Sequence, residues 1–369
     1  MLIYLDNAAT TPLCEVAKQA IVEHLDTFGN PSSSHELGRQ SRLLIENARE
    51  IIAKCINAES DEIYFTSGGS EANTWALHDI NLITSNIEHH SISSSRKLKI
   101  PVERVGLIDP NAIDIMLRRT IDPSVFTRPT VVSCMAVNNE IGTKNNIGAI
   151  ARVSHHYDAL FHTDAVQAVG HIPIDVKRID CDMLSASGHK FGGPKGIGFL
   201  YVKHETLIHP LIRGGKQEQG MRPGTENILG IIAMAAALED AVEHMDERNN
   251  HIKHLRDKLL NKLLQIDGSY LNGSLADRTA SNINIRFDGV SGSRLVTLCS
   301  LYDICISSGS ACNEGIATPS HVLKALGLSD EQALNSIRIT LGHQNTEEEI
   351  DIAANIITQL VERIRSNEE

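Results

Sequence analysis

Short β-rich runs alternate with amphipathic segments through the first two thirds of the sequence, and this alternation constrains the fold more than any other feature. An amphipathic segment at residues 41–54 is typical of the helical stretches. The β-rich runs are residues 62–65, 131–137, 160–162, 183–185 and 198–202. Strands that alternate with helices indicate βαβ units, which build a mostly parallel sheet. The sequence therefore predicts an α/β fold.

A long helical pattern from about residue 226 to 264 marks the end of this alternation. Shorter elements follow it, at residues 283–287, 293–301, 304–306 and 346–365. A chain of 369 residues has the length of about two domains. We therefore expect a large domain at 13–260 and a smaller α/β domain formed by 1–12 and 261–369.

Residues 307–315 read Ser-Ser-Gly-Ser-Ala-Cys-Asn-Glu-Gly, a run of small residues that predicts a mobile loop without a fixed element. A short helix is expected after it. Thr318 is its predicted N-cap, Pro319 its first residue, and Gly327 ends it.

Composition and charge argue against several classes of protein. With 34 Lys+Arg against 46 Asp+Glu the net charge is −12, so direct nucleic-acid binding is not expected. The longest apolar run, residues 228–238, is well short of the ~20 residues of a membrane helix. The N-terminus has no signal-peptide pattern, and a cytoplasmic location is expected. The seven cysteines show neither a C-x-x-C pair nor zinc spacing, so no metal site is predicted.

A glycine-rich turn at residues 65–73 follows a predicted strand and leads into a helical pattern. Such a turn places backbone N–H groups, here those of Gly69 and Ser70, where they can bind a phosphate. It lacks both the Walker A sequence and the G-x-G-x-x-G fingerprint, so ATP and NAD are poorly supported. Taken alone, the turn fits a purely structural role equally well.

Lys190 lies among small residues, in Ser187-Gly188-His189-Lys190 and Gly192-Gly193, just after another predicted strand. A lysine buried there would lose charge and become a nucleophilic amine, as a Schiff base with a carbonyl cofactor requires. Single lysines are usually solvated surface cations, and Lys195 is predicted to be one.

Polar side chains end three further predicted strands. Asp164 lies where ligands meet an open α/β sheet, and a buried carboxylate there can keep a pyridinium nitrogen protonated. Asn139 offers an amide at the end of the 131–137 strand. His89 can stack on a ring or move a proton, although a lone histidine is more often structural.

These features together are what pyridoxal 5′-phosphate (PLP) requires. The sequence resembles the cysteine desulfurases, which are class V aminotransferase-like enzymes of the fold-type-I PLP architecture. That architecture implies a large domain with a mostly parallel seven-stranded sheet and a smaller α/β domain. The resemblance covers nearly the whole chain and rests on residues 4–12, 29–33, 66–73, 138–142, 162–167, 187–190, 222–227, 307–312 and 336–338.

The resemblance implies roles around the cofactor. Lys190 would form the Schiff base and remove the Cα proton, His89 would stack on the ring and serve in acid–base steps, and Asp164 would pair with the ring nitrogen. Asn139 and Gln167 would bond the region of the phenolic oxygen. The phosphate would be held by Gly69, Ser70, Ser187, His189 and, from the second subunit of a homodimer, Thr225.

The resemblance also implies the reaction. Arg338, with Asn139, would bind the carboxylate of L-cysteine, which suits a planar guanidinium. Cys312 would be the nucleophile that takes the sulfur as a persulfide, and L-alanine would be released. The acceptor would be an iron–sulfur scaffold or a tRNA-thiolation protein. Apart from a transient iron–sulfur contact at Cys312, no metal is expected, and no membrane partner.

Two alternatives stay open. A selenocysteine lyase shares these residues, whereas a non-catalytic sulfur-relay or scaffold protein would not need the intact Lys190, Asp164 and Cys312. The sequence departs from the family pattern at Lys216 and Gln219, where glycine and Arg or His are usual. At Ser91 alanine is common, and this change is expected to alter surface contacts. The sequence ends soon after its last helix, without the tail some relatives use to dock a scaffold protein, so the acceptor is left open.

Overall fold

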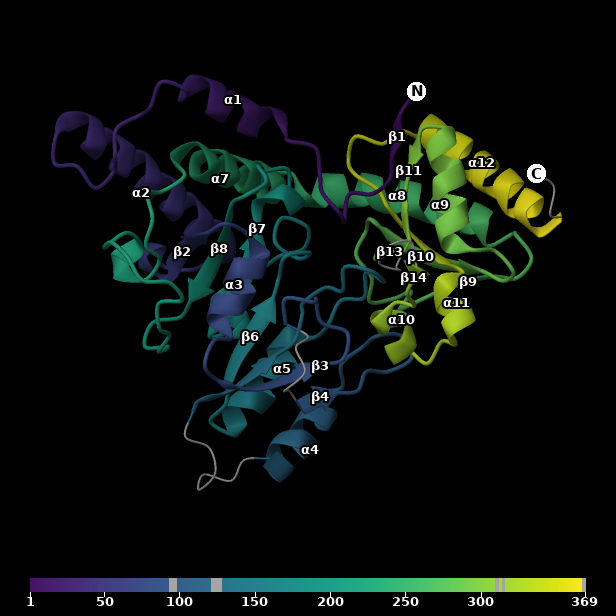
Figure 1. Ribbon diagram of the computed structural model, residues 1–369, viewed down its shortest axis with the longest axis horizontal. Helices are drawn as coiled ribbons and strands as arrows, with labels where there is room; N and C mark the ends of the chain where they lie inside the picture. The colour runs from purple at the N-terminus through teal and green to yellow at the C-terminus, as the bar shows by residue number, and fades with distance from the viewer. Residues whose placement is uncertain (93–97, 121–127, 309–311, 314–315, 367–369) are drawn as a thin grey trace.

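A seven-stranded sheet forms the centre of the larger part of the molecule (Figure 1). The computed structural model describes residues 1–92, 98–120, 128–308, 312–313 and 316–366. The strands of this sheet are β2 (Ile63–Thr66), β3 (Asn81–Ser85), β4 (Leu98–Ile100), β5 (Thr130–Ser133), β6 (Leu160–Asp164), β7 (Met183–Ser187) and β8 (Gly198–Val202). They lie in the order β2-β8-β7-β6-β5-β3-β4, and every neighbouring pair is parallel except those that β8 makes. The predicted fold class, α/β with a mostly parallel seven-stranded sheet, is confirmed.

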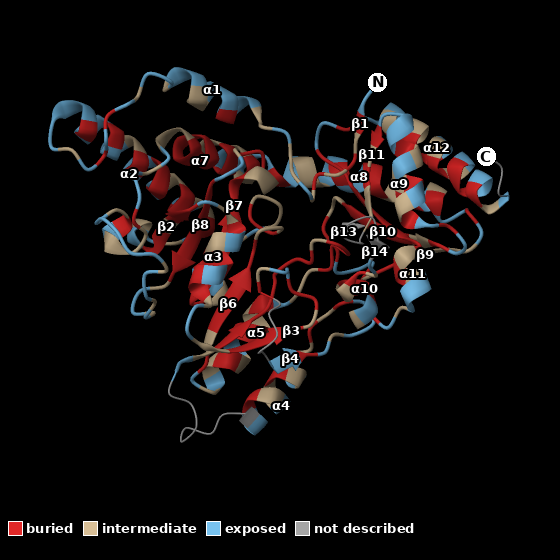
Figure 2. Ribbon diagram, viewed as in Figure 1, coloured by how far each residue is buried: buried red, intermediate tan, exposed pale blue. Residues whose placement is uncertain are grey.

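Both faces of this sheet are buried (Figure 2). Consecutive residues of a strand point to opposite faces, and in these strands both are buried. Val132 and Leu184 enter the larger core, whereas their neighbours Val131 and Met183 enter a smaller core with Trp75 of α3. The helices of this part are α1 (Glu15–Glu23), α2 (Glu36–Ile56), α3 (Gly69–Ala76), α4 (Pro110–Thr120), α5 (Ile147–His156), α6 (Val176–Ile179) and α7 (Ile228–Glu243). In the described ranges, no helix is both long and apolar enough to span a bilayer.

A second hydrophobic core surrounds a four-stranded sheet in the order β12-β15-β10-β9. Ile3 and Leu5 belong to this core although they lie at the other end of the chain, because β1 pairs with β11. Residues of α8 from Ile252 onward also pack in this core. The second core thus begins earlier in the chain than the domain boundary expected at residue 260. Its elements are β1 (Ile3–Tyr4), α8 (Met245–Leu263), β9 (Ser269–Leu271), β10 (Asn282–Phe287), α9 (Gly292–Leu301), β11 (Ile304–Cys305), β12 (Ser307–Ser308), β15 (Ser336–Thr340) and α12 (Glu347–Ser366).

The single helical stretch predicted over 226–264 is wrong, since His244 separates α7 from α8. His244 has φ −101° and ψ 12°, outside the α-helical range, and its N–H donates to Asp240. α7 is buried in the first core, whereas α8 is more polar and reaches the second core. The break therefore separates a helix of the first core from a helix that reaches the second.

Two local predictions near residue 310 are also wrong. Ser307 and Ser308 form β12, paired with β15, although the composition of this stretch predicted no fixed element. The backbone of β13 (Cys312–Asn313) pairs with that of β14 (Ile316–Ala317). The next helix, α10 (His321–Ala325), has Ser320 rather than Thr318 as its N-cap, because the Ser320 hydroxyl accepts from the N–H groups of the first turn. Helix α11 (Asp330–Leu334) follows.

A buried ion pair holds the short helix η3 (Glu218–Gly220) against the large sheet. The Glu218 carboxylate accepts from Arg49 Nη1 at 2.8 Å and Nη2 at 2.7 Å, and from the backbone N–H of Phe65 at 2.9 Å. Arg49 Nη1 also donates to the carbonyl of Ile63. This pair connects α2, β2 and the loop that carries Lys216 and Gln219.

We predict that Glu218→Gln lowers the free energy of unfolding by about 3–5 kcal/mol, because it removes the buried counter-charge of Arg49 and leaves only the half-exposed Glu46 carboxylate, 3.1 Å from Arg49 Nε. Urea titration at one fixed protein concentration measures this. The matched control is Glu36→Gln, which breaks the exposed Arg39–Glu36 pair and should change little. Equal effects of the two substitutions would contradict the prediction.

Candidate active site

A cavity of about 330 Å³ opens at the carboxyl ends of the parallel strands, with Arg338 of β15 in its wall. Ligands of open α/β sheets bind at this edge. The cavity brings together the predicted site residues Gly69, Ser70, His89, Asn139, Asp164, Gln167, Ser187, His189, Lys190 and Arg338. Thr225 is exposed and does not line it, and the side chain of Cys312 lies outside the described part of the chain.

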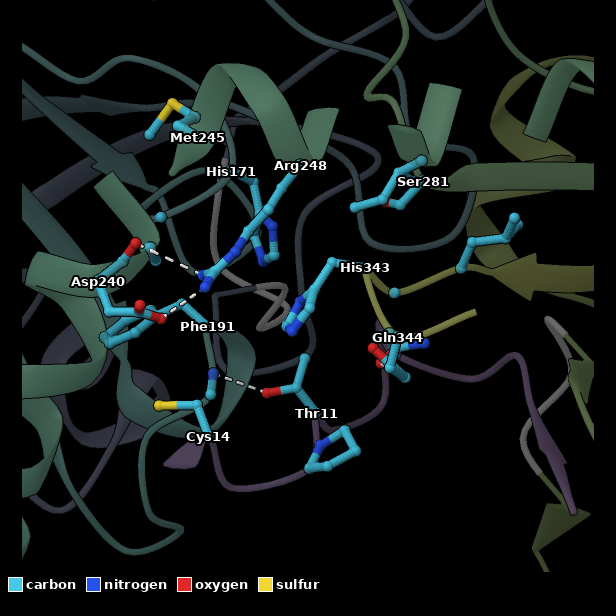
Figure 3. Close-up of a pocket in the computed structure, with 18 of the residues that line it drawn as sticks. Thr11, Cys14, His171, Phe191, Asp240, Met245, Arg248, Ser281, His343 and Gln344 are labelled. Carbon is cyan, nitrogen blue, oxygen red and sulfur yellow. Dashed lines mark hydrogen bonds and ion pairs between the residues drawn. The ribbon is translucent and has the colours of Figure 1, made fainter. Parts of the chain in front are cut away.

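A second cavity, of about 360 Å³, lies between the N-terminal segment, the α7–α8 junction and residues 341–344. Figure 3 shows Arg248 paired with Asp240 and the Thr11 hydroxyl bonded to the backbone N–H of Gly192. None of the predicted site residues lines this cavity. We therefore place the candidate active site in the first one.

Lys190 ends the short helix η2 (Gly188–Lys190), directly after β7. Its Nζ donates to the carbonyls of Ala8 at 2.7 Å and Ala9 at 2.8 Å, and its own carbonyl accepts from His171 Nε2 at 2.8 Å. Burial, and then the nearby Arg338 cation, lower the pKa of Lys190 to about 8. The amine is therefore still mostly protonated at pH 7, but the neutral, nucleophilic form becomes abundant at mildly alkaline pH, well below the range of an ordinary lysine.

Asp164 lies at the end of β6 and is buried. One carboxylate oxygen accepts from the backbone N–H of Val166 at 3.0 Å, and the other from Asn73 Nδ2 at 2.7 Å. Burial raises the pKa of Asp164, although these hydrogen bonds oppose the shift. A cation placed beside this carboxylate would favour its ionised form.

Arg338 projects from β15 with only part of its guanidinium engaged. Nη1 donates to the carbonyl of Asn139 at 3.1 Å and Nη2 to Asp6 Oδ1 at 2.8 Å. Nε is buried and has no hydrogen-bond partner among the described residues. A buried guanidinium with a vacant N–H suits a carboxylate ligand.

The turn before α3 forms the other side of the cavity. Gly68 has φ +150°, and a Cβ on Gly69 would lie 2.5 Å from Val166, so both positions require glycine. The N-terminus of α3 with Ser70 and Ser187 can hold a phosphate. His189 lies beside them, and burial followed by the charge of Lys190 lowers its pKa to about 4. With Lys190, Asp164 and Arg338's vacant Nε, these residues fit PLP and an amino-acid substrate.

Three residues of the site were not assigned roles from the sequence. Asn73 holds Asp164, Asp6 holds Arg338, and Ser91 contacts His89 at the cavity wall. Asn73 and Asp6 lie within the segments that carry the resemblance. Their position in those segments was the one sequence feature that could have indicated a role in the site. Ser91 was expected to alter surface contacts, which stays a prediction; in the structure its hydroxyl bonds the site residues Asn73 and His89.

Known proteins similar to this chain were found by sequence and by structure. The aminotransferase class-V family matches residues 3–352. The cysteine desulfurase IscS of Dictyoglomus turgidum is 42% identical over 384 residues, covering 99% of this chain and 95% of that protein. The IscS of Methanosarcina thermophila is 39% identical and covers 99% and 93%.

Solved structures agree with these matches. A NifS-like protein from Rickettsia africae superposes with a TM-score of 0.90 at 32% identity, covering 99% of this chain and 100% of that one. A structure described as SspA in complex with cysteine has a TM-score of 0.79 at 34% identity, covering 93% and 100%.

We predict that Lys190 of the cofactor-free protein is acetylated with a midpoint near pH 8, well below the 10.5 of an ordinary lysine. Arg338→Gln should move the midpoint to higher pH, because it removes a cation that disfavours the charged amine. Peptide mass spectrometry across a pH series measures both, with exposed lysines of the same digest as the reference. A midpoint near 10.5, or no response to Arg338→Gln, would show that the amine is not tuned in this way.

Proposed function

The chain belongs to the cysteine desulfurases of the aminotransferase class-V family, and we propose which of its residues carry out the reaction. It is a PLP-dependent enzyme that removes sulfur from L-cysteine. One observation carries our assignment: Lys190, Asp164 and Arg338 line a single cavity, and Arg338 Nε has no hydrogen-bond partner among the described residues.

We assign the cofactor's contacts to residues of that cavity. Lys190 would hold PLP covalently, Asp164 would face the ring nitrogen, and His89 would stack on the ring. Asn139 and Gln167 would lie by the phenolic oxygen. The phosphate would be bound by Gly69, Ser70, Ser187 and His189. Bound PLP supplies an electron sink for bonds broken at the substrate's carbon atoms.

The remaining steps belong to the protein. Arg338 and Asn139 would hold the substrate carboxylate, the Lys190 amine would take the Cα proton, and His89 would pass protons within the cavity. The Cys312 thiolate would attack the substrate sulfur. An S–S bond forms as the substrate's C–S bond breaks, and that bond's electron pair stays on carbon, which is protonated to the methyl group of L-alanine.

The position of β12 supports Cys312 as the nucleophile. Ser307 pairs with Arg338 itself, so the segment that carries Cys312 starts beside the proposed carboxylate site. Cys312 lies four positions after Ser308, and an extended chain covers at most ~3.6 Å per residue, or about 14 Å here. Cys312 is thus limited to the neighbourhood of Arg338.

We further propose that the enzyme is a homodimer in which Thr225 completes the phosphate site of the partner subunit. Thr225 is exposed and lies outside the cavity of its own chain. An apolar surface around α2, with Phe28 80% and Leu43 61% exposed, lines one hollow and supports a contact between subunits. The persulfide would pass to an acceptor protein of iron–sulfur cluster assembly or of tRNA thiolation.

Replacing Arg338 by alanine should cost about 2–5 kcal/mol of transition-state stabilisation, because the substrate carboxylate loses its charged partner. The measurement is kcat/KM for alanine formation from L-cysteine. Arg294→Ala, at an exposed position of α9, is the control. Retained absorbance of bound PLP would show that the variant is folded, and an unchanged kcat/KM would then remove Arg338 from the substrate site.

Cys312→Ser tests the function directly. We expect the variant to bind PLP and to change its spectrum when L-cysteine is added, but to lose alanine formation by orders of magnitude, since a hydroxyl is a poor nucleophile toward sulfur. Cys305→Ser is the matched control and should keep its activity. Mass spectrometry after turnover should find the extra sulfur on Cys312. Sulfur on Cys305, or full activity of Cys312→Ser, would contradict the proposed mechanism.

A further inference from the structure

The hydroxyl of Ser91 lies between two groups of the active site. Its Oγ is 2.8 Å from Nδ1 of His89 and 3.0 Å from Nδ2 of Asn73. The same Asn73 nitrogen donates to Asp164 Oδ2 at 2.7 Å. A continuous set of hydrogen bonds therefore joins His89 to the buried carboxylate through Ser91 and Asn73.

The directions of these hydrogen bonds are determined by the donors. The Asn73 amide nitrogen can only donate, so Ser91 Oγ accepts from it and keeps its own hydrogen for another partner. The backbone N–H of Ser91 also donates to Nδ1 of His89, at 3.2 Å. Nδ1 therefore faces one certain donor and one available donor, which makes it the acceptor of the ring. The proton of the neutral imidazole then resides on Nε2.

We propose that Ser91 is a positioning residue that holds His89 in the Nε2–H tautomer and couples it, through Asn73, to Asp164. The inference rests on the acid–base role of His89 proposed above. It adds that the nitrogen available for proton transfer is Nε2, since the turn at Ser91 engages Nδ1.

The same arrangement determines how His89 responds to pH. Burial has the largest effect and lowers the pKa of His89; the Asp164 carboxylate raises it, and His90, Lys190 and His321 lower it. Protonation at Nδ1 would place a new N–H opposite the backbone N–H of Ser91. The Ser91 hydroxyl would also lose the acceptor for its hydrogen. Ser91 therefore favours the neutral ring, and removing its hydroxyl should raise the pKa.

The test is Ser91→Ala in the PLP-bound enzyme, with the histidines labelled with ¹⁵N. His89 signals are assigned by their loss in His89→Gln, and ring ¹⁵N shifts report the tautomer. We expect unprotonated Nδ1 in the native enzyme. Ser91→Ala keeps the backbone N–H that donates to Nδ1 but loses the hydroxyl donor, so we expect the neutral Nε2–H ring to lose stability and the pKa of His89 to rise by roughly 0.5–1 unit, the value of one hydrogen bond.

Two further variants separate this role from a structural one. Ser91→Thr keeps a hydroxyl and should retain the native tautomer and pKa, whereas Ser300→Ala removes an exposed hydroxyl of α9 and should leave both unchanged. The acid limb of the kcat profile for alanine formation should move to higher pH in Ser91→Ala by the same amount as the pKa. A native Nδ1–H tautomer, or identical ¹⁵N titrations of the native enzyme and Ser91→Ala, would overturn the proposal.

This outcome is distinct from failure of the proposed function. Full turnover by His89→Gln would refute the acid–base role of His89, yet the tautomer measured by ¹⁵N would still show whether Ser91 positions the ring.

Discussion

The N-terminal turn at residues 6–11 holds the two halves of the active site together. Its first residues bond the smaller sheet: both the backbone N–H and the side-chain amide of Asn7 donate to the Thr340 carbonyl, and Asp6 pairs with Arg338. Its later residues bond the larger part, where Thr11 donates to the His189 carbonyl and the Ala8 carbonyl accepts from Lys190. The distance between the amine and the guanidinium therefore depends on this turn.

Charge balance within the cavity follows from the same contacts. Lys190 and Arg338 are cations, and Asp6 and Asp164 are the acids that raise the pKa of Lys190 against burial and against Arg338. A substrate carboxylate at Arg338 would add a negative charge near Lys190 and so shift its amine toward the protonated form. The proposed proton transfer at Lys190 would thereby be linked to occupancy of the proposed carboxylate site.

Prediction from the sequence succeeded where the signal is local and failed where tertiary contacts decide. The strands 62–65 and 198–202 were predicted within a residue of β2 and β8 because both are short apolar runs with turn residues around them. The break at His244 was missed, because the apolar and polar patterns on either side of it are each helical, and only the folded chain shows that α7 and α8 contribute to different cores. Ser320 was missed as an N-cap because Thr318-Pro319 has the usual capping sequence, whereas Ser320 is also held by the Glu140 carboxylate.

For the site, the residue types predicted one shared location, and the structure brings the predicted residues other than Thr225 and Cys312 to one cavity; their roles remain proposals. The hydrogen bonds of Ser91 could not be predicted, because Asn73 and His89 come from different elements and meet only in the folded chain. The Asp6–Arg338 ion pair could not be predicted for the same reason, because the two residues lie 332 positions apart in the sequence.

The segment that carries Cys312 begins at Ser307 and ends at Ser320 and His321, and the contacts of this second end limit where Cys312 can lie relative to the cavity. Ser320 donates to the buried Glu140, and His321 donates to the Glu88 carbonyl while its ring lies 4.8 Å from that of His90. Glu88 and Glu140 adjoin His89 and Asn139 in sequence, so the segment returns to the strand ends that hold the site. Together with the pairing of Ser307 and Arg338, this anchors both flanks of the segment at the cavity's walls. If Cys312 is the nucleophile, as proposed, a thiol carried between two such anchors would lose little loop-closure entropy on meeting the substrate, because its reach is already limited to the cavity's surroundings.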